Sequence, residues 1–183
     1  MRIISGFLKG RTIKGHNIDG TRPTMDRVKE SLFAIIQNSI SDSVVLDLFS
    51  GSGNLGIEAI SNGSKLCYFN DINKECIKTI DKNIKDLNIG EHSIVLNKDW
   101  NSCLEYLASS SIKLDIIFLD PPYKMECLND IIDKIMEYKL LNPNGLIVCE
   151  ISNMYLKEFD SLEEIKNRKY GDKLIVIYKN RNK

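Results

Sequence analysis

Short apolar runs alternate with longer stretches of helical hydrophobic spacing along most of this chain. The short runs are bounded by turn residues and are too short for helices, so they predict strands buried on both faces. These strands are expected at 44–49, 65–70, 93–97, 114–119 and 146–151. Helical spacing of apolar residues is found at 25–36, from 54 onward, at 74–87 and at 128–136. The alternation predicts an α/β fold with a mostly parallel sheet and helices on both of its faces.

The N-terminal part precedes this alternation. Residues 1–14 contain short β-prone pieces broken by glycines, which predicts a small basic β-hairpin. In the helix that follows, Thr24 is a plausible N-cap. Arg22, Arg27 and Lys29 lie off the apolar face of that helix. They are therefore expected to be free for solvent or phosphate.

The C-terminal part closes the sheet. Residues 143–145 predict a turn before the fifth strand, and the polar stretch 154–166 is compatible with a helix. Residues 169–178 predict a hairpin at the sheet edge, which gives a seven-stranded sheet with an antiparallel C-terminal strand. We expect a single domain, 1–183, made of a basic arm at 1–20 and a Rossmann-like core at 21–183.

A glycine turn follows the first strand. Gly51, Gly53 and Gly56 fit the spacing of a dinucleotide loop, where a helix N-terminus faces a ligand, but this spacing alone is a weak signal. Asp47 lies in the strand just before the turn, where a carboxylate would repel a pyrophosphate and suit a ligand with an ammonium group. S-adenosylmethionine is such a ligand, and 47–53 resembles the cofactor loop of Rossmann-like methyltransferases. A tight turn without a ligand is the alternative.

Acidic residues also follow the second and third strands. Asp71 lies about twenty residues beyond the glycines, where a carboxylate can accept both ribose hydroxyls. Capping the next helix is its alternative role, although Asn73 can cap that helix instead. Asp99 and Trp100 suit an adenine, with the carboxylate accepting from the amine and the indole bordering the ring. Ordinary core packing is the alternative for Trp100.

The fourth strand runs directly into Asp120-Pro121-Pro122-Tyr123. An exocyclic base amine is a poor nucleophile because its lone pair is delocalised into the ring. The Asp120 carboxylate and the Pro121 carbonyl can accept its two N–H bonds and localise that lone pair, while the prolines stiffen the loop. Tyr123 offers a flat surface for an extruded base. The alternative is a proline turn after a buried strand.

Composition adds a charge asymmetry to this picture. The chain has 183 residues, 43% of them hydrophobic, and equal numbers of basic and acidic residues, 25 of each. Residues 1–30 hold seven basic residues against three acidic ones, so this head carries +4 and the remainder −4. Such a basic patch is typical of a surface that binds phosphate groups. The alternative is an ordinary solvated surface, which the charge alone does not distinguish from a phosphate-binding one.

The five cysteines are scattered and lack metal-site spacing, which predicts reduced thiols and no metal site. No stretch of the sequence has the length of a membrane span or the apolar core of a signal peptide. We therefore expect a soluble cytoplasmic protein with no membrane partner.

Nearly the whole chain resembles the RsmD family, bacterial enzymes that methylate the N2 amine of one guanine in 16S, small-subunit, rRNA. The resemblance covers 2–6 with 9–11, 22–30 with 32–33, the glycine loop, the Asp-Pro-Pro-Tyr tetrapeptide and 170–172. Its most specific part is Arg22-Pro23-Thr24, a segment that in such enzymes helps to close over the cofactor. Asn70 replaces an acid found in some members, so either Asp71 or Asn70 is left to contact the ribose.

The resemblance implies a class I S-adenosylmethionine-dependent methyltransferase that releases S-adenosylhomocysteine and needs no metal. The implied cofactor contacts are Thr24, Asp47, Phe49, Ser50, Gly51, Gly53, Asp71, Ile72, Asp99 and Trp100. The implied catalytic residues are Asp120, Pro121, Pro122 and Tyr123, and the implied RNA contacts are Arg2, Lys9, Arg11, Arg22 and Arg27. The expected partner is 16S rRNA within a partly assembled small subunit, and the expected oligomeric state is a monomer.

Three other functions remain open at this point. The same chemistry could act on a DNA adenine or cytosine, or on a protein glutamine amide. A chain of this fold could also be a non-catalytic RNA-binding module, although its intact acidic and glycine positions argue against that. An NAD oxidoreductase is disfavoured by the length of the chain and by Asp47.

Overall fold

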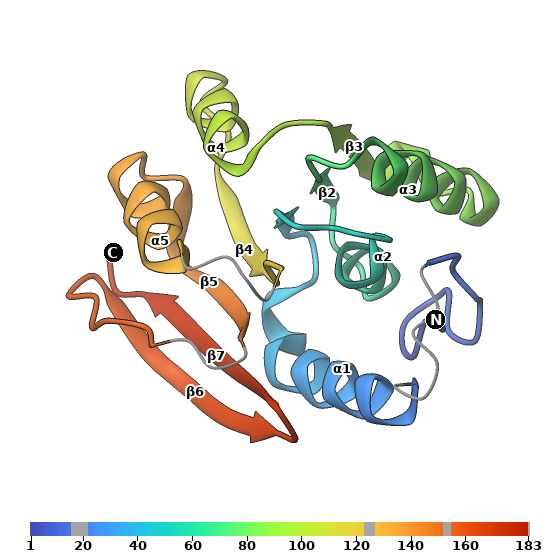
Figure 1. The fold of residues 1–183 in the computed structure, drawn as a ribbon, viewed down its shortest axis with the longest axis horizontal. Helices are drawn as coiled ribbons and strands as arrows, with labels where there is room; N and C mark the ends of the chain where they lie inside the picture. Colours follow the sequence, from blue (N-terminus) through green and yellow to red (C-terminus); the bar gives the residue numbers. More distant parts are fainter. Residues whose placement is uncertain (16–21, 123–126, 152–154, 183) are drawn as a thin grey trace.

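In the part of the chain that the structure describes, seven strands form one sheet in the order β3-β2-β1-β4-β5-β7-β6 (Figure 1). The structure, a computed structural model, describes residues 1–15, 22–122, 127–151 and 155–182, with 22–25 described by their backbone only. The strands are β1 Val44–Asp47, β2 Leu66–Asn70, β3 Ser93–Leu96, β4 Leu114–Leu119, β5 Leu141–Ile151, β6 Leu162–Tyr170 and β7 Lys173–Asn180. Strands β1 to β5 pair in parallel, whereas β7 runs antiparallel to β5 and β6. The expected Rossmann-like fold, mostly parallel with an antiparallel C-terminal hairpin, is confirmed.

Helices cover both faces of this sheet (Figure 1). They are α1 Arg22–Ile36, α2 Asn54–Ser61, α3 Lys74–Leu87, α4 Trp100–Ser109 and α5 Leu128–Glu137, with short 3-10 turns at Gln37–Ser39 and Gly90–His92. Successive strand residues face opposite sides, as the pleat requires. Val45 packs in a cluster with α1, α2 and α3, whereas Leu46 packs in a second cluster with α4 and α5. None of the helices in the described ranges is long and apolar enough to cross a membrane.

The order of the strands places the site. The chain leaves β1 toward β2 and β3 on one side, and returns to β4 and β5 on the other. The carboxyl ends of β1 and β4 therefore border a topological switch point, which is where open α/β sheets bind ligands. The two ends are also tied together, because the Leu48 N–H donates to the Phe118 carbonyl at 3.2 Å.

The prediction of a helix at 154–166 was wrong, because β6 begins within this stretch at Leu162. This strand lies at the sheet edge, where most of its side chains are exposed on both faces. Without a buried face, a strand shows no apolar alternation. Its charged side chains also discourage pairing with another sheet.

Residues 143–145 lie inside β5 instead of forming a turn before it. The register of β5 against β4 shifts here, because Leu114 pairs with Leu141 whereas Ile116 pairs with Leu146, so the pairing is irregular around 143–145. Asn144 adopts a left-handed conformation with φ 61°, and Asn142 Nδ2 donates to Asp115 Oδ1 at 2.7 Å. The turn-forming residue types at 143–145 therefore indicate an irregularity within β5, and not the turn before it.

Two helix starts also differ from the expectation. Helix α1 begins at Arg22, so Thr24 lies inside the helix and is not its N-cap. Helix α4 was not predicted, although its buried residues Cys103, Leu104 and Leu107 have helical spacing. Asp99 is the N-cap of α4 and accepts a hydrogen bond from the Ser102 N–H at 3.0 Å.

The N-terminal segment, 1–15, has less regular backbone pairing than the predicted β-hairpin would have. A single antiparallel bridge joins Arg2 and Thr12, and the Ile3 N–H donates to the Arg11 carbonyl at 2.9 Å. Ile3, Leu8 and Ile13 are buried in the cluster with α1, α2 and α3. This arm therefore belongs to the same hydrophobic core as the helices that surround it.

Candidate active site

A cavity of about 730 Å³ lies along the carboxyl edge of the parallel strands. It is lined by residues from nearly every strand end in spatial order: Trp100 after β3, Asp71 after β2, Ser50 after β1, Asp120 after β4, Glu150 on β5 and Lys173 on β7. The glycine loop and the Asp-Pro-Pro segment, which are far apart in the sequence, thus border one cavity.

The glycine loop forms a tight turn between β1 and α2. Gly53 has φ 82°, a left-handed conformation that few residues with a side chain adopt. Its N–H donates to the Ser50 carbonyl at 2.7 Å, which closes the turn. At Gly56, an added Cβ would lie 2.3 Å from the Phe69 ring and 2.7 Å from the Cys67 sulfur. The third glycine is therefore required for close packing of α2 on β2, and the loop backbone faces the cavity at Gly51.

Asp47 is a buried carboxylate in the cavity wall. Its side chain is 2% exposed, and Oδ2 accepts a hydrogen bond from the Gly56 N–H at 3.0 Å. Desolvation raises the pKa of Asp47 to about 7, with smaller contributions from the charges of Asp120 and Asp71. A cationic group in the cavity would stabilise the ionised carboxylate.

Asp71 is held against the glycine loop. Its Oδ2 accepts from the Gly51 N–H at 2.9 Å, and its Oδ1 accepts from the Asn73 N–H at 2.8 Å. Asn73 is the N-cap of α3, as expected. By contrast, the amide of Asn70 donates to the Leu48 and Lys98 carbonyls, both at 3.1 Å. Asn70 therefore joins two loops, and Asp71 is the better candidate for a ribose contact.

The far end of the cavity contains the residues expected to meet an adenine. Asp99 Oδ2 accepts from the Ser102 hydroxyl at 2.7 Å, and the hydrogen bonds from Ser102 lower the pKa of Asp99. Trp100 both lines the cavity and packs against the cluster with α4 and α5, so its adenine contact stays a prediction beside its packing role. Ile72 is 70% exposed and also lines the cavity.

Asp120, Pro121 and Pro122 line the cavity directly beyond β4. Solvent reaches the Asp120 side chain, yet the surrounding protein desolvates it enough to raise the pKa of its carboxyl. The Lys173 ammonium acts in the opposite direction and lowers that pKa. Tyr123 lies outside the described residues.

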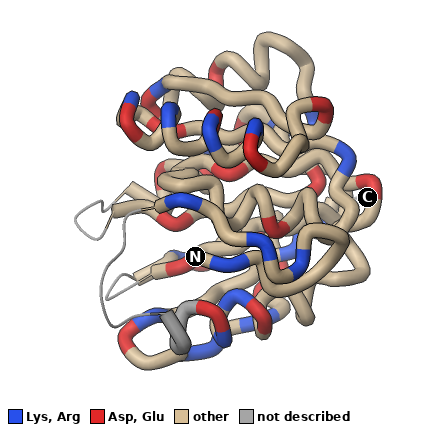
Figure 2. Tube along the Cα trace, turned by 90° about the vertical axis from the view of Figure 1, so that its right-hand side faces the viewer, with Lys and Arg blue, Asp and Glu red and all other residues tan. Residues whose placement is uncertain are grey.

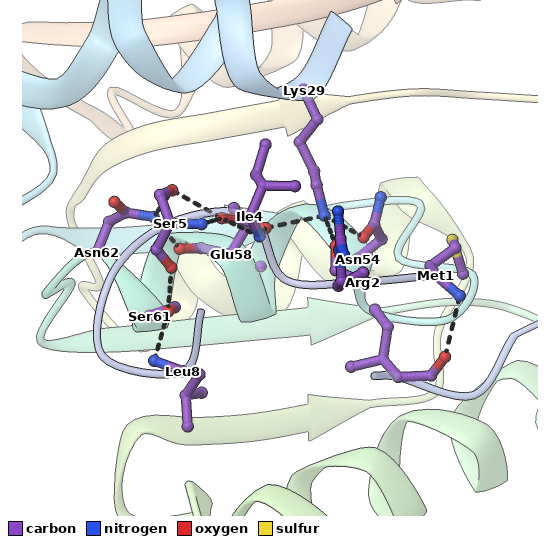
Figure 3. Close-up of polar contacts among 12 residues, drawn as sticks. Met1, Arg2, Ile4, Ser5, Leu8, Lys29, Asn54, Glu58, Ser61 and Asn62 are labelled. Carbon is purple, nitrogen blue, oxygen red and sulfur yellow. Dashed lines mark hydrogen bonds and ion pairs between the residues drawn. The ribbon is translucent and has the colours of Figure 1, made fainter. Parts of the chain in front are cut away.

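The expectation that Lys29 is free for solvent or phosphate was wrong. Lys29 is 4% exposed and its Nζ lies 2.8 Å from Oε2 of Glu58, which is fully buried on α2 (Figure 3). The same Nζ donates to the Arg2 carbonyl and to Asn54 Oδ1, both at 2.8 Å. Glu58 also accepts from the Ser5 N–H at 2.8 Å and from the Ile4 N–H at 3.1 Å. The pair therefore joins α1, α2 and the arm beside the cavity.

Sequence reasoning missed this pair, although one signal was present. Glu58 is a lone charge within the apolar run 57–60, and a charge in such a position is either paired or at a helix surface. Nothing in the sequence indicated which cation would reach it.

The other basic residues of the N-terminal region remain at the surface. Arg2, Lys9, Arg11 and Arg27 are exposed, and Figure 2 shows Lys and Arg positions on the chain around the N-terminus. Arg11 Nη2 donates to the Asp86 carbonyl at 2.9 Å. Arg22 is the first residue of α1.

Comparisons with known proteins point to one group. The model of a family described as "Conserved hypothetical protein 95" matches residues 1–179. YlbH of Bacillus subtilis is 40% identical over 183 residues, which is 99% of this chain and 100% of that protein. A Haemophilus influenzae protein named "Ribosomal RNA small subunit methyltransferase D" is 37% identical over 153 residues, 82% of this chain and 78% of that protein.

Solved structures agree on the fold. The Escherichia coli protein YhhF superimposes with a TM-score of 0.86 at 27% identity, covering 100% of this chain and 99% of that one. An RNA methyltransferase from Salinibacter ruber, solved in complex with S-adenosyl-L-homocysteine, has a TM-score of 0.67 at 13% identity, covering 86% and 92%.

Proposed function

The chain belongs to the RsmD family of rRNA methyltransferases, and we propose that its cavity brings S-adenosylmethionine to the N2 amine of a guanine in small-subunit rRNA. The observation that carries this proposal is that the glycine loop after β1 and the Asp-Pro-Pro segment after β4 line one cavity. Transfer of a labelled methyl group to small-subunit RNA tests it.

The cavity residues fit the cofactor. The buried Asp47 carboxylate suits its ammonium group, and we assign the ribose hydroxyls to Asp71, which lines the cavity beside the glycine loop. Ile72, Asp99 and Trp100 border the region assigned to the adenine. Phe49, Ser50, Gly51 and Gly53 form or flank the loop between these two ends. Thr24 in α1 remains a proposed contact through the family resemblance.

Catalysis by this chain consists of positioning and of hydrogen bonding to the amine. S-adenosylmethionine supplies an electrophilic methyl group on a sulfonium that leaves as a neutral thioether. The Asp120 carboxylate and the Pro121 carbonyl would accept hydrogen bonds from the two N–H groups of the guanine amine and localise its lone pair for in-line attack on the methyl group. The methylated nitrogen then loses one proton. Pro121 and Pro122 fix these acceptors before the base arrives, and Tyr123 is the proposed stacking surface.

The RNA is expected to approach over the arm and the start of α1. Arg2, Lys9, Arg11 and Arg27 are exposed there. The arm is joined to the cavity wall, because Nζ of Lys29, which borders the cavity, donates to the Arg2 carbonyl at 2.8 Å. We assign these side chains, together with Arg22, to phosphate contacts. The substrate in this proposal is rRNA within a partly assembled small subunit in the cytoplasm, and the enzyme acts as a monomer.

Cofactor affinity should fall as the pH drops below about 7. Burial raises the pKa of Asp47 to about 7, and a bound ammonium group would lower it, so binding releases a proton from this carboxyl. Affinity should weaken by up to about tenfold per pH unit below the pKa and level off above it. Calorimetry with S-adenosylhomocysteine between pH 5.5 and 8 measures this dependence. The Asp47→Asn variant should lack it, whereas an identical pH profile in both proteins would remove Asp47 from the ammonium site.

Removing two charges from the arm should weaken RNA binding and its salt dependence together. In the double variant Arg2→Ser with Lys9→Ser, the slope of log affinity against log salt should shrink by about 1.5, because each lost phosphate contact lowers the counterions released. Filter binding to small-subunit RNA at several salt concentrations gives the slope. The matched control is Lys113→Ser with Lys139→Ser, which removes the same charge where β4 and β5 begin. Equal slopes in the two double variants would place the RNA elsewhere.

A further inference from the structure

An ion pair in the cavity wall has no role in the mechanism above. Glu150 lies near the end of β5, and Lys173 is the first residue of β7. Both line the cavity, with 14% and 24% of their side chains exposed. The Lys173 ammonium forms an ion pair with Oε1 of Glu150.

The sheet places this pair beside the Asp120 carboxylate. The register of β4 and β5 pairs Leu119 with Cys149, so the next residue on each strand, Asp120 and Glu150, continue side by side. Val148 and Ile175 pack on the α1 face of the sheet, and the alternation of strand residues puts Glu150 and Lys173 on that same face. The electrostatic effect of Lys173 on Asp120 agrees with this proximity. A carboxylate, a second carboxylate and an ammonium thus follow one another across β4, β5 and β7.

The guanine edge has hydrogen-bonding groups in a matching order. Beside the N2 amine, with its two donors, lie the N1–H donor and then the O6 acceptor. When Asp120 and the Pro121 carbonyl hold the amine, a carboxylate next to them can accept from N1–H, and an adjacent ammonium can donate to O6. Adenine and cytosine have an unprotonated ring nitrogen beside their amine. The lone pair of this nitrogen would face the second carboxylate and be repelled by it.

A purely structural role explains the pair less well. Strands β5 and β7 are already joined by a continuous antiparallel register from Leu146–Lys179 to Ile151–Leu174. The β6–β7 turn is also tied to α1, because the hydroxyls of Tyr170 and Ser31 lie 2.5 Å apart. A largely buried ion pair adds little stability where the backbone is already fixed, because the cost of desolvating both charges offsets their attraction.

We propose that the Glu150–Lys173 pair reads the N1–H and O6 groups of the target base and so selects guanine over adenine and cytosine. This inference rests on the proposed function of the site. Glu150 and Lys173 are specificity-determining residues in this account, and Asp120 with Pro121 remain the acceptors of the reacting amine.

The test uses small-subunit RNA in which the target guanosine is replaced by 2-aminopurine. This base keeps the amine at C2 but lacks both N1–H and O6. Single-turnover rates with saturating S-adenosylmethionine are compared for guanosine and 2-aminopurine. Intrinsic differences in nucleophilicity are common to all protein variants, so the ratio of the two rates isolates recognition by the protein.

Wild-type protein should prefer guanosine by about a thousandfold, because a site built to bond N–H and C=O groups strongly rejects an analogue without them. Lys173→Met should lower the guanosine rate by about a hundredfold more than the 2-aminopurine rate. Glu150→Gln should reduce the preference by at least about tenfold and raise the 2-aminopurine rate, because the amide can donate to the unprotonated N1. Lys173→Arg should recover much of the preference.

The matched control is the exposed pair of Lys157 and Asp133, whose Nζ and Oδ2 atoms lie 2.6 Å apart. Lys157→Met and Asp133→Asn should leave the preference unchanged. An equal loss on both bases in Lys173→Met, or an unchanged preference in Glu150→Gln, would overturn the inference, because the pair would then act through Asp120 or on folding. If the wild-type protein methylates neither base, the proposed function itself fails.

Discussion

Replacing Asp120 by alanine should lower methyl transfer to small-subunit RNA by about a thousandfold and leave S-adenosylhomocysteine binding within about threefold of wild type. The carboxylate accepts from the guanine amine in the transition state, whereas the proposed cofactor contacts come from Thr24 in α1, from the end of β1 and from the segments after β1, β2 and β3. Removing its charge also removes one of the influences that raise the pKa of Asp47. Single-turnover kinetics and calorimetry on the same preparation separate the two effects.

The matched control for this substitution is Asp160→Ala, which removes an exposed carboxylate from the loop before β6. Asp120→Asn should retain part of the activity, because its amide oxygen still accepts one N–H bond. A near-normal rate for Asp120→Ala would show that the segment after β4 is a structural turn.

Breaking the buried pair of Lys29 and Glu58 should have the largest effect on stability. Lys29→Met leaves the fully buried Glu58 carboxylate without its cation, which should lower the free energy of unfolding by about 3–5 kcal/mol. Cofactor affinity should fall as well, since Lys29 borders the cavity and bonds to Asn54, the first residue of α2. Urea unfolding, monitored by circular dichroism, measures the free energy of unfolding.

The comparison for this variant is Lys78→Met, which removes one partner of an exposed pair on α3 whose Nζ and Oε1 atoms lie 2.7 Å apart. Solvent screens that pair, so its loss should cost less than about 0.5 kcal/mol. A similar, small change in both variants would mean that the buried ion pair of Lys29 with Glu58 does not stabilise the fold.

The sequence was sufficient for the parallel half of the fold. Buried parallel strands are nearly all apolar, as in Leu114–Leu119, and therefore stand out from the helices between them. The edge strand Leu162–Tyr170 exposes both faces and has no such pattern, so it was mistaken for a helix. The irregular segment 143–145 of β5 contains the same residue types as a free turn, and only the register of β5 against β4 distinguishes the two.

Only the part of the site that directly follows the parallel strands could be predicted from the sequence. Residues directly after β1, β2, β3 and β4 could be expected to converge, because the carboxyl ends of parallel strands share one edge. Lys29, Glu150 and Lys173 reach the same cavity from a helix, from the interior of β5 and from an antiparallel strand. No local motif marks these residues, since their position depends on how distant elements pack.

Methylation of small-subunit particles from cells that lack this activity tests the central claim most directly. The particles are incubated with the protein and S-adenosylmethionine labelled in its methyl group, and the RNA is then digested to nucleosides and analysed by mass spectrometry. The account predicts stoichiometric N2-methylguanosine with the wild-type protein and none with Asp120→Ala. Label in an adenosine or cytidine, or only in ribosomal protein, would contradict it.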